Sequence, residues 1–267
     1  MSIQEIDFSK VLNDDHVYDA MMANYNELGK DWIQHQFNWM NNVYLSFKDH
    51  YKYMIVISLV EKTLHFYNQM NIQLTYDQYY SKSYLQIDKF SITELCEKLQ
   101  LPKETIRRKV LELEKLGVLK RQKKQIIIDR NAFDFVKPQN QIKFTSKYIN
   151  QVSDIMNREK IYSKKNNPKY IEQVIKKNFS TTWKWFYSMQ IPLVIGYHEM
   201  FKDLATFHIW GTICMNQAFN FKRENIKSLN PDYSTFNTNV IRGTGNRNGL
   251  SAMSISDMTN IPRATVI

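Results

Sequence analysis

Cysteine, glycine and proline are all scarce in this sequence, and each shortage narrows the class of protein. The two cysteines, Cys96 and Cys214, are too few for a disulfide framework or for a zinc site built on cysteine, which favours a reducing compartment. Seven glycines and six prolines in 267 residues favour helices over a turn-rich β protein.

Long hydrophobic runs and a signal peptide are also missing. The longest apolar stretches, residues 54–60 and 191–197, are far shorter than a bilayer span. The opening MSIQEIDFSK carries acids where a signal peptide carries lysines, and no apolar segment follows it. We therefore expect a soluble, cytoplasmic protein without a membrane partner.

Patterns typical of enzymes and metal sites are weak. His198-Glu199 would begin a zincin motif, but Lys202 stands where the second histidine is needed. The segment 243-GTGNRNG-249 has neither dinucleotide-binding nor Walker A spacing, and we interpret it as a connector. No nucleophile–base arrangement can be read, although such groups assemble only in space. We predict a protein that is not an enzyme and has no cofactor or metal.

Positive charge is what the sequence has in excess. The formal net charge is +10 at pH 7, and residues 103–124 hold nine bases against three acids. Residues 158–177 hold seven bases against two acids. Such clustering indicates a polyanionic partner, either nucleic acid or an anionic membrane surface.

Apolar residues at three- and four-residue spacings predict helices over residues 16–48 and 51–70, and again around 198–222. Their many aromatic side chains are interpreted as core, with a pocket for a small-molecule effector as the alternative. The stretch starting 47-FKD aligns with the stretch starting 201-FKD, and a tryptophan pair precedes each (Trp32 and Trp39, Trp183 and Trp185). This repeated order predicts two copies of one unit.

The segment 90-FSITELCEKLQLPKETIRRKVLELEKLGVLKRQKKQIIIDR-130 has the pattern of a winged helix-turn-helix. Ser91 and Glu94 form a capping box, and Pro102 suits the start of a second helix. A buried stripe is expected at Ile106, Val110, Leu113 and Leu116, with Gly117 as the C-terminal cap. Residues 118–120 and 125–129 are expected to form two strands around the turn 121–124.

The phrase LPKETIRRKVLELEKLGVLKR resembles the recognition helix and wing of bacterial winged-helix transcriptional regulators, the class that holds the MarR, GntR and IclR families. The resemblance covers about forty residues of the chain. It implies that the second helix enters the major groove of DNA and that the hairpin meets phosphates or the minor groove. The residues expected to contact DNA in this copy are Lys103, Glu104, Thr105, Arg107, Arg108, Arg121, Lys123 and Lys124.

The same motif begins again 160 residues further on. The segment 91-SITELCEKLQLPKETI-106 matches 251-SAMSISDMTNIPRATV-266 without a gap, and Asn260 stands at the turn, where a left-handed backbone is expected. Arg263 and Thr265 are the corresponding candidate DNA contacts. Ile267 falls opposite Arg107, so we expect the natural protein to continue for about 25 residues or more. As given, the second motif is not expected to read DNA alone.

The predicted fold is mainly α with small β-wings, a tandem repeat of a helical unit followed by a winged helix-turn-helix. The expected parts are an aromatic-rich helical unit (1–89), a winged helix-turn-helix (90–136), a linker with a second helical unit (137–249) and the truncated start of a second helix-turn-helix (250–267). Within the third part, 137-KPQNQIK-143 is predicted as a polar linker.

The predicted function is sequence-specific binding of double-stranded DNA, as a transcriptional regulator acting as a pseudo-dimeric monomer or a homodimer. The alternatives are a plasmid-type replication initiator with tandem winged helices and a winged-helix module that binds protein.

Overall fold

The computed structural model describes residues 13–87, 91–122, 125–132, 137–162, 166–224 and 249–267. The chain divides into two compact units that are interleaved in sequence. Unit 1 comprises Met1–His35, Asn140–Glu172 and Cys214–Gly249, and unit 2 comprises Gln36–Gln139, Gln173–Ile213 and Leu250–Ile267. The candidate DNA-binding segment lies entirely in unit 2.

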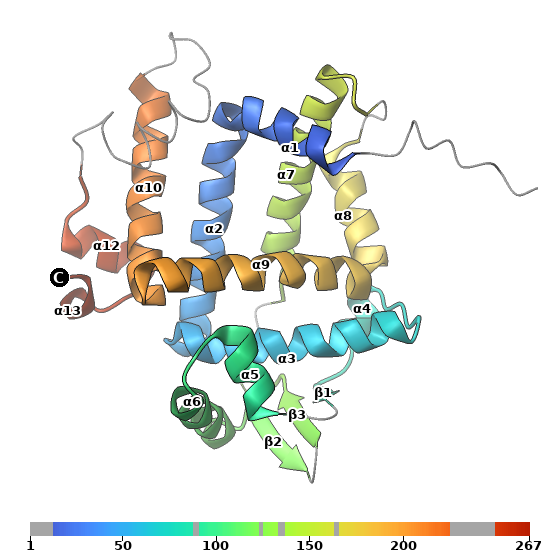
Figure 1. The fold of residues 1–267 in the computed structure, drawn as a ribbon, viewed down its shortest axis with the longest axis vertical. Coiled ribbons are helices and arrows are strands. Elements are labelled where there is room, and N and C mark those ends of the chain that lie inside the picture. Colours follow the sequence, from blue (N-terminus) through green and yellow to red (C-terminus); the bar gives the residue numbers. More distant parts are fainter. Residues whose placement is uncertain (1–12, 88–90, 123–124, 133–136, 163–165, 225–248) are drawn as a thin grey trace, which may run out of the picture. The chain divides into compact units, whose positions relative to one another are not determined.

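The described part of the chain is mainly helical, as predicted (Figure 1). The elements up to the first helix-turn-helix are α1 (Asp14–Ala23), α2 (Tyr25–Phe47), α3 (His50–Gln69), α4 (Tyr76–Tyr80), β1 (Tyr84–Ile87), α5 (Ile92–Leu99) and α6 (Lys103–Lys115). The remaining elements are β2 (Leu119–Gln122), β3 (Gln125–Asp129), α7 (Gln139–Arg158), α8 (Pro168–Lys177), α9 (Phe179–Phe201), α10 (Leu204–Glu224), α12 (Ala252–Thr259) and α13 (Arg263–Val266).

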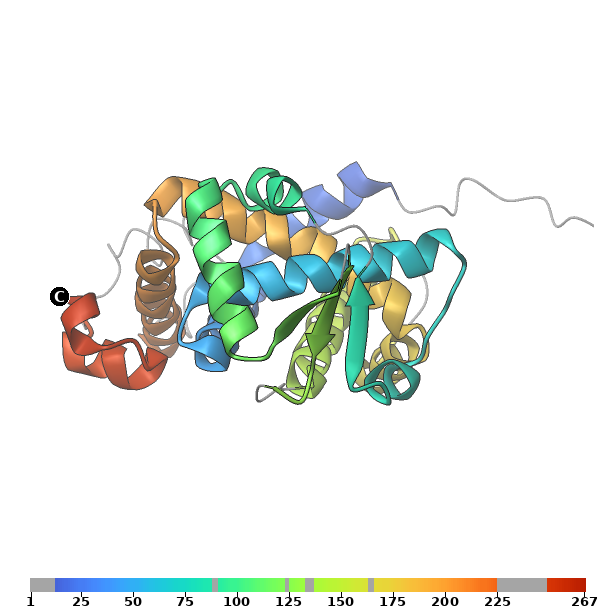
Figure 2. The ribbon, with the colours of Figure 1, turned by 90° about the horizontal axis from the view of Figure 1, so that it is seen from below.

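In unit 2, α3 is the helix around which the other elements are arranged. It packs along α9 and also contacts α5, α6 and β1 (Figures 1 and 2). Residues 54–60 of α3 are all buried, and all of them except Ser58 are apolar, as expected for a helix that is covered on several sides. The aromatic side chains serve the core here as predicted, since Trp39 and Trp183 are 3% and 2% exposed. Trp185, at 61% exposed, does not.

Unit 1 has a smaller apolar core. Ala20, Leu28, Ile155 and Met156 are buried together, and Tyr148 and Val152 of α7 pack against them. The buried Gln141 amide lies 2.7 Å from Nε2 of the buried His35, so these two polar side chains of the unit are paired with each other.

The wing is a three-stranded antiparallel sheet with the strand order β1-β3-β2. β2 and β3 form the predicted hairpin. β1 was not predicted, because its four residues are too few for a convincing alternation in sequence. Leu85 of β1 and Leu119 of β2 both lie opposite Ile128, which gives the sheet one buried face.

Two predicted boundaries are wrong. The segment 137–143 was expected to be a linker, but α7 begins at Gln139 because Gln141 and Ile142 are buried and continue the helical pattern. A helix was expected around 198–222, but α9 continues to Phe201 and α10 starts only at Leu204. Between them, Lys202 has a left-handed φ of 60°. This conformation is uncommon for lysine, so nothing in the sequence indicated it.

Candidate nucleic-acid interface

The first helix of the motif, α5, starts and stops by local chemistry. The Ser91 hydroxyl accepts a hydrogen bond from the Glu94 N–H at 3.3 Å, which satisfies one free amide of the first turn. The Glu94 carboxylate pairs with Lys62 of α3 instead of completing a capping box. Gln100 ends the helix with a left-handed φ of 52°, and Leu101 is buried beneath the turn.

The second helix, α6, buries a narrower stripe than predicted. Ile106, Val110 and Leu113 are fully buried, as expected. Leu116 is 52% exposed, so its predicted place in the stripe is wrong. The reason is that the helix has already ended: the Val118 N–H donates to the Leu113 carbonyl, and Gly117 has a φ of 75°. This Schellman motif sends the chain into the wing, with Val118 as the next buried side chain.

The opposite face of α6 presents the predicted contact residues to the surface. Lys103, Glu104, Arg107 and Arg108 are exposed, and Thr105 is half-buried. Arg108, with 67% of its side chain accessible, lies 4.0 Å from Glu112, and Arg107 lies 3.5 Å from Glu104. These exposed pairs are weak, so DNA can compete for both arginines. Sequence reasoning missed Leu111, which is 52% exposed and follows Arg107 and Arg108 along the helix.

The two bases on β2, Lys120 and Arg121, are both in ion pairs. Arg121, predicted as a phosphate contact, pairs with Glu114 of α6. Lys120 Nζ lies 2.8 Å from Asp129 Oδ2, and this hydrogen bond lowers the pKa of the Asp129 carboxyl. Lys123 and Lys124, the other predicted wing contacts, lie outside the described residues.

A network of charges that sequence reasoning missed fixes α6 to the start of α3. The Asp49 carboxylate caps α3 by accepting from the N–H groups of Tyr51 and Lys52, at 2.9 and 3.2 Å. The same carboxylate accepts from Lys109 Nζ of α6. Lys52 Nζ lies 2.8 Å from Glu112 and lowers the pKa of that carboxyl. Because the side chains of Lys109 and Lys52 are mostly buried, these pairs hold α6 in position and present little positive charge at the surface.

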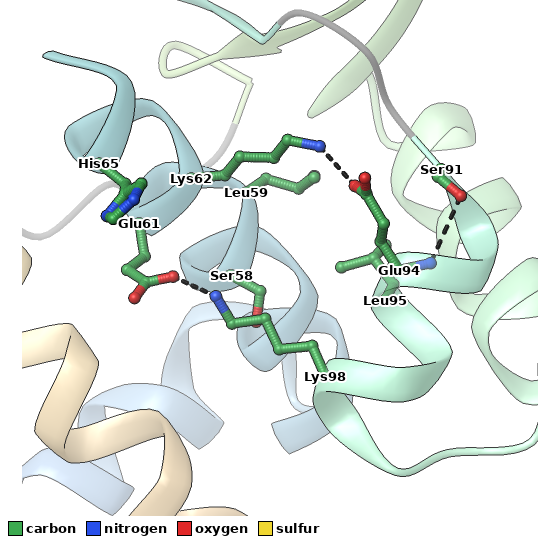
Figure 3. A pocket seen from close by; sticks show the side chains of 9 residues that line it. All are labelled: Ser58, Leu59, Glu61, Lys62, His65, Ser91, Glu94, Leu95 and Lys98. Atoms are coloured by element: carbon green, nitrogen blue, oxygen red, sulfur yellow. Dashed lines mark hydrogen bonds and ion pairs between the residues drawn. The ribbon is translucent and has the colours of Figure 1, made fainter. Parts of the chain in front are cut away.

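A second set of ion pairs joins α5 to α3. Lys62 pairs with Glu94 and Lys98 pairs with Glu61, one pair on each side of a shallow groove (Figure 3). The groove has a volume of about 380 Å³, and its floor holds the buried Ser58 hydroxyl, which has no hydrogen-bond partner among the described residues. Together with the pairs that Lys109 and Lys52 make, these ion pairs attach both helices of the motif to α3.

Arg130 attaches the end of the wing to α4. Its Nη1 donates to the carbonyls of Tyr79 and Lys82, at 2.6 and 2.8 Å. Its guanidinium also lies over the Tyr79 ring, 4.2 Å from the centroid. Arg130 is 8% exposed, so this base holds the sheet in place and is not available to a phosphate.

The second motif has the same local geometry over the residues that it shares with the first. Ser251 accepts from the Ser254 N–H at 3.1 Å, and Asn260 has the expected left-handed φ of 59°. Pro262 precedes α13, and the two candidate contacts, Arg263 and Thr265, are both exposed.

Other predicted features have less to show. Most of the connector at 243–249 lies outside the described residues. Within the described ranges, no three His, Cys, Asp or Glu side chains come together as a metal-binding group. Of the helices in those ranges, none is both long and apolar enough to cross a bilayer.

A family model described as the DeoR-like helix-turn-helix domain matches residues 83–124. The match spans β1, α5, α6 and β2, which include both helices of the first motif and one strand of its hairpin. It supports a DNA-binding winged helix-turn-helix of the kind found in transcriptional regulators, without naming MarR, GntR or IclR. Comparison with curated proteins gave no match, and comparison with solved structures gave none either.

Proposed function

We propose that the protein binds double-stranded DNA in a sequence-specific manner and acts as a transcriptional regulator. The observation that carries the proposal is the exposed face of α6: two weakly paired arginines and the half-buried Thr105 lie on a helix whose opposite stripe is fully buried. A helix that lies in the major groove needs hydrogen-bonding side chains on such a face, near its N-terminus.

The side chains on this face suit base edges. An arginine donates two hydrogen bonds to guanine O6 and N7, glutamate accepts from cytosine N4, and threonine meets a thymine methyl. The exposed Leu111 side chain adds an apolar contact for a thymine methyl one turn further along the helix. Lys103, Arg121, Lys123 and Lys124 are assigned to the DNA backbone.

The scaffold supports the same proposal. Ion pairs from α3 to both α5 and α6, and the Arg130 anchor at the end of the sheet, hold helix and wing in one orientation. A helix-turn-helix that is already held in one orientation loses little conformational entropy when it binds DNA. We assign the second motif, with Arg263 and Thr265, to a second reader of the same kind. An effector remains a prediction, and the groove beside Ser58 is where a small molecule would touch both α3 and α5.

The proposal is tested by selecting binding sites from random DNA and then measuring affinity by fluorescence anisotropy at several salt concentrations. If about six phosphates are contacted, affinity falls roughly a thousandfold between 50 and 200 mM salt. A salt response close to zero would favour a protein-binding winged helix and refute the proposal.

Two variants separate base reading from phosphate binding. Arg108→Ala is expected to relax preference at one base pair, at a cost of about 1–3 kcal/mol. Lys123→Ala should weaken all sequences alike and flatten the salt dependence. Lys115→Ala, an exposed base at the far end of α6, is the control for a general loss of charge. Equal effects of Arg108→Ala and Lys123→Ala on every sequence would contradict the assigned roles.

A further inference from the structure

The helices before each helix-turn-helix have matching boundaries at a constant spacing of 154 residues. α1, α2 and α3 begin at Asp14, Tyr25 and His50, and α8, α9 and α10 begin at Pro168, Phe179 and Leu204, each 154 residues later. α1 and α2 end at Ala23 and Phe47, which correspond in the same way to Lys177 and Phe201. Only the last end differs, by one residue.

The hydrogen bonds before and between the first two helices repeat at the same spacing. The carbonyls of Asn13 and Asn167 each accept from the residue four positions on, both at 3.1 Å. Asn24 and Asn178 each direct their side-chain Nδ2 at the carbonyl four residues earlier, at 2.9 and 3.0 Å. Asparagine therefore stands at both junctions in both copies and makes equivalent bonds.

The corner between the second and third helices repeats as well. Lys48 and Lys202 take left-handed φ angles of 51° and 60°, and both donate their N–H to the carbonyl four residues back at 2.7 Å. The next residue is an aspartate in each copy, and both caps are made: Asp49 accepts from two amides of α3, and Asp203 accepts from the Thr206 N–H at 2.8 Å.

The contact between the second helices of the two copies, α2 and α9, is reciprocal. Gln36 and Gln190 occupy equivalent positions, and each donates to the side-chain oxygen of the other, at 3.2 and 2.6 Å. Both are buried, at 8% and 0% exposed. A residue that bonds to its own equivalent lies on a twofold axis, because a head-to-tail arrangement brings together different positions.

The ring contacts of unit 2 agree with such an axis. Tyr44 of α2 contacts His208 of α10, with ring centroids 6.4 Å apart. His198 stands at the position equivalent to Tyr44, and it contacts Tyr51 of α3, with centroids 5.6 Å apart. Each copy therefore places the same position of its second helix against the third helix of the other copy.

We propose that the chain is an internal duplication whose copies are related by an approximate twofold axis between Gln36 and Gln190, so that one chain presents two helix-turn-helix motifs to an inverted repeat in DNA. A twofold relation between readers requires half-sites in opposite orientations, whereas a translational relation would require direct repeats. This inference rests on the proposed DNA-binding function and adds the form of its target.

The two half-sites differ in sequence. Lys103, Glu104 and Thr105 of the first reader correspond to Arg263, Ala264 and Thr265 of the second. The glutamate that can accept from cytosine N4 has no counterpart in the second copy. The target is therefore an imperfect inverted repeat.

The positions that hold the first motif on its scaffold change together in the second copy. The ion pair between Glu61 and Lys98 corresponds to Met215 and Met258, and the pair between Lys62 and Glu94 corresponds to Asn216 and Ser254. Uncharged residues stand at all four corresponding positions of the second copy, so no lone charge is left. This is the pattern expected if the two copies diverged from one duplicated unit, because an unpaired charge at such a position would be costly.

The target is tested with the full-length protein and half-sites taken from its selected binding sequence. Probes carry the two half-sites inverted or in the same orientation, with centres about 10 base pairs apart, or one half-site alone. We expect the inverted probe to bind at least tenfold more tightly than the others, and native mass spectrometry to show one chain per probe. Preference for the direct repeat, or two chains per inverted probe, would overturn the inference while leaving DNA binding intact. Failure to bind any selected probe would instead remove the proposed function.

The axis itself is tested by unfolding measurements on Gln36→Leu, Gln190→Leu and the double variant. Each single change leaves one buried amide without its partner, whereas the double change removes both. We expect the folding equilibrium constant of the double variant to exceed the value expected from the two singles by at least tenfold. Additive effects would contradict a paired axis.

Discussion

Gly117 shows how a single backbone angle separates the reading helix from the wing. Its φ of 75° belongs to the left-handed region, where a side chain costs free energy, and it permits the two hydrogen bonds that close the end of α6. Among the residues that the structure describes, the only neighbour of an added Cβ would be the Ala132 side chain at 3.7 Å, an ordinary contact. The effect of substitution at this position is therefore a backbone effect.

Gly117→Ala is expected to lower the free energy of unfolding by about 1–2 kcal/mol, because alanine is strained at this φ. Gly196→Ala is the matched control. Gly196 lies inside α9, and no described residue would come within 4 Å of an added Cβ, so alanine should stabilise the helix by roughly 1 kcal/mol. Urea denaturation of both variants tests the pair, and a loss of stability in both would contradict the explanation.

At this scale, local chemistry was readable in the sequence and distant chemistry was not. Ser91, Gly117 and Asn260 act through atoms within a few residues of themselves, and their roles as caps were predicted. Lys109 was counted only as one of many bases, because its partner Asp49 lies 60 residues away in the chain. No sequence pattern links Lys109 to Asp49, and only the folded structure brings them together.

The element to which we assign DNA reading is α6, and its buried stripe ends at Leu113, three residues earlier than helical spacing suggests. Leu113 is fully buried beneath the helix, whereas Leu116 lies beyond its last turn and is 52% exposed. Periodicity alone treats the two leucines alike, because it does not show where the helix stops. Periodicity also failed to predict β1, because this strand forms by pairing with β3 and its own four residues show no clear pattern.

Leu113→Ala is expected to lower the free energy of unfolding by about 2–5 kcal/mol, because it leaves a cavity under the reading helix. Leu116→Ala should change it by no more than about 0.5 kcal/mol, as is usual for surface substitutions. Thermal and urea unfolding, monitored by circular dichroism, compare the two variants. Similar losses in both would show that Leu116 is buried after all.

At the scale of the whole molecule, unit 2 holds a buried chain of polar groups. The His208 ring lies 2.8 Å from Asn41 Oδ1 through Nε2 and 3.1 Å from His50 Nε2 through Nδ1. Because an amide oxygen only accepts, His208 carries its proton on Nε2 and accepts from His50 through Nδ1. Burial lowers the pKa of His50 to about 4 and that of His208 to about 3. Asp49 and Asp203 act on His50 in the opposite sense but more weakly.

The protein is therefore expected to lose stability in mild acid. An unfolded histidine binds a proton below about pH 6.5, whereas these two stay neutral in the fold, so protons favour the unfolded chain. The free energy of unfolding should fall as the pH drops from about 6.5 towards 4, by about 1.4 kcal/mol per pH unit for each histidine. Urea titrations at pH 7.5, 5.5 and 4.5 measure this slope.

His208→Asn should make the slope shallower, since it removes one of the groups that must stay neutral. His65→Gln is the control, because that side chain is exposed on α3. An unchanged slope in His208→Asn would show that other groups cause the acid sensitivity.

In the duplication that we propose, the copies that carry Gln36 and Gln190 belong to one polypeptide, and this changes how the occupancy of a DNA target depends on the concentration of the protein. Two separate subunits must first meet, so at low concentration their dimer, and with it the bound fraction, falls as the square of the concentration. A chain that carries both halves has no such step, and its bound fraction falls only in proportion. In a cell that holds only a few molecules, every molecule would therefore still carry both DNA-binding motifs, as it would in a cell that holds thousands.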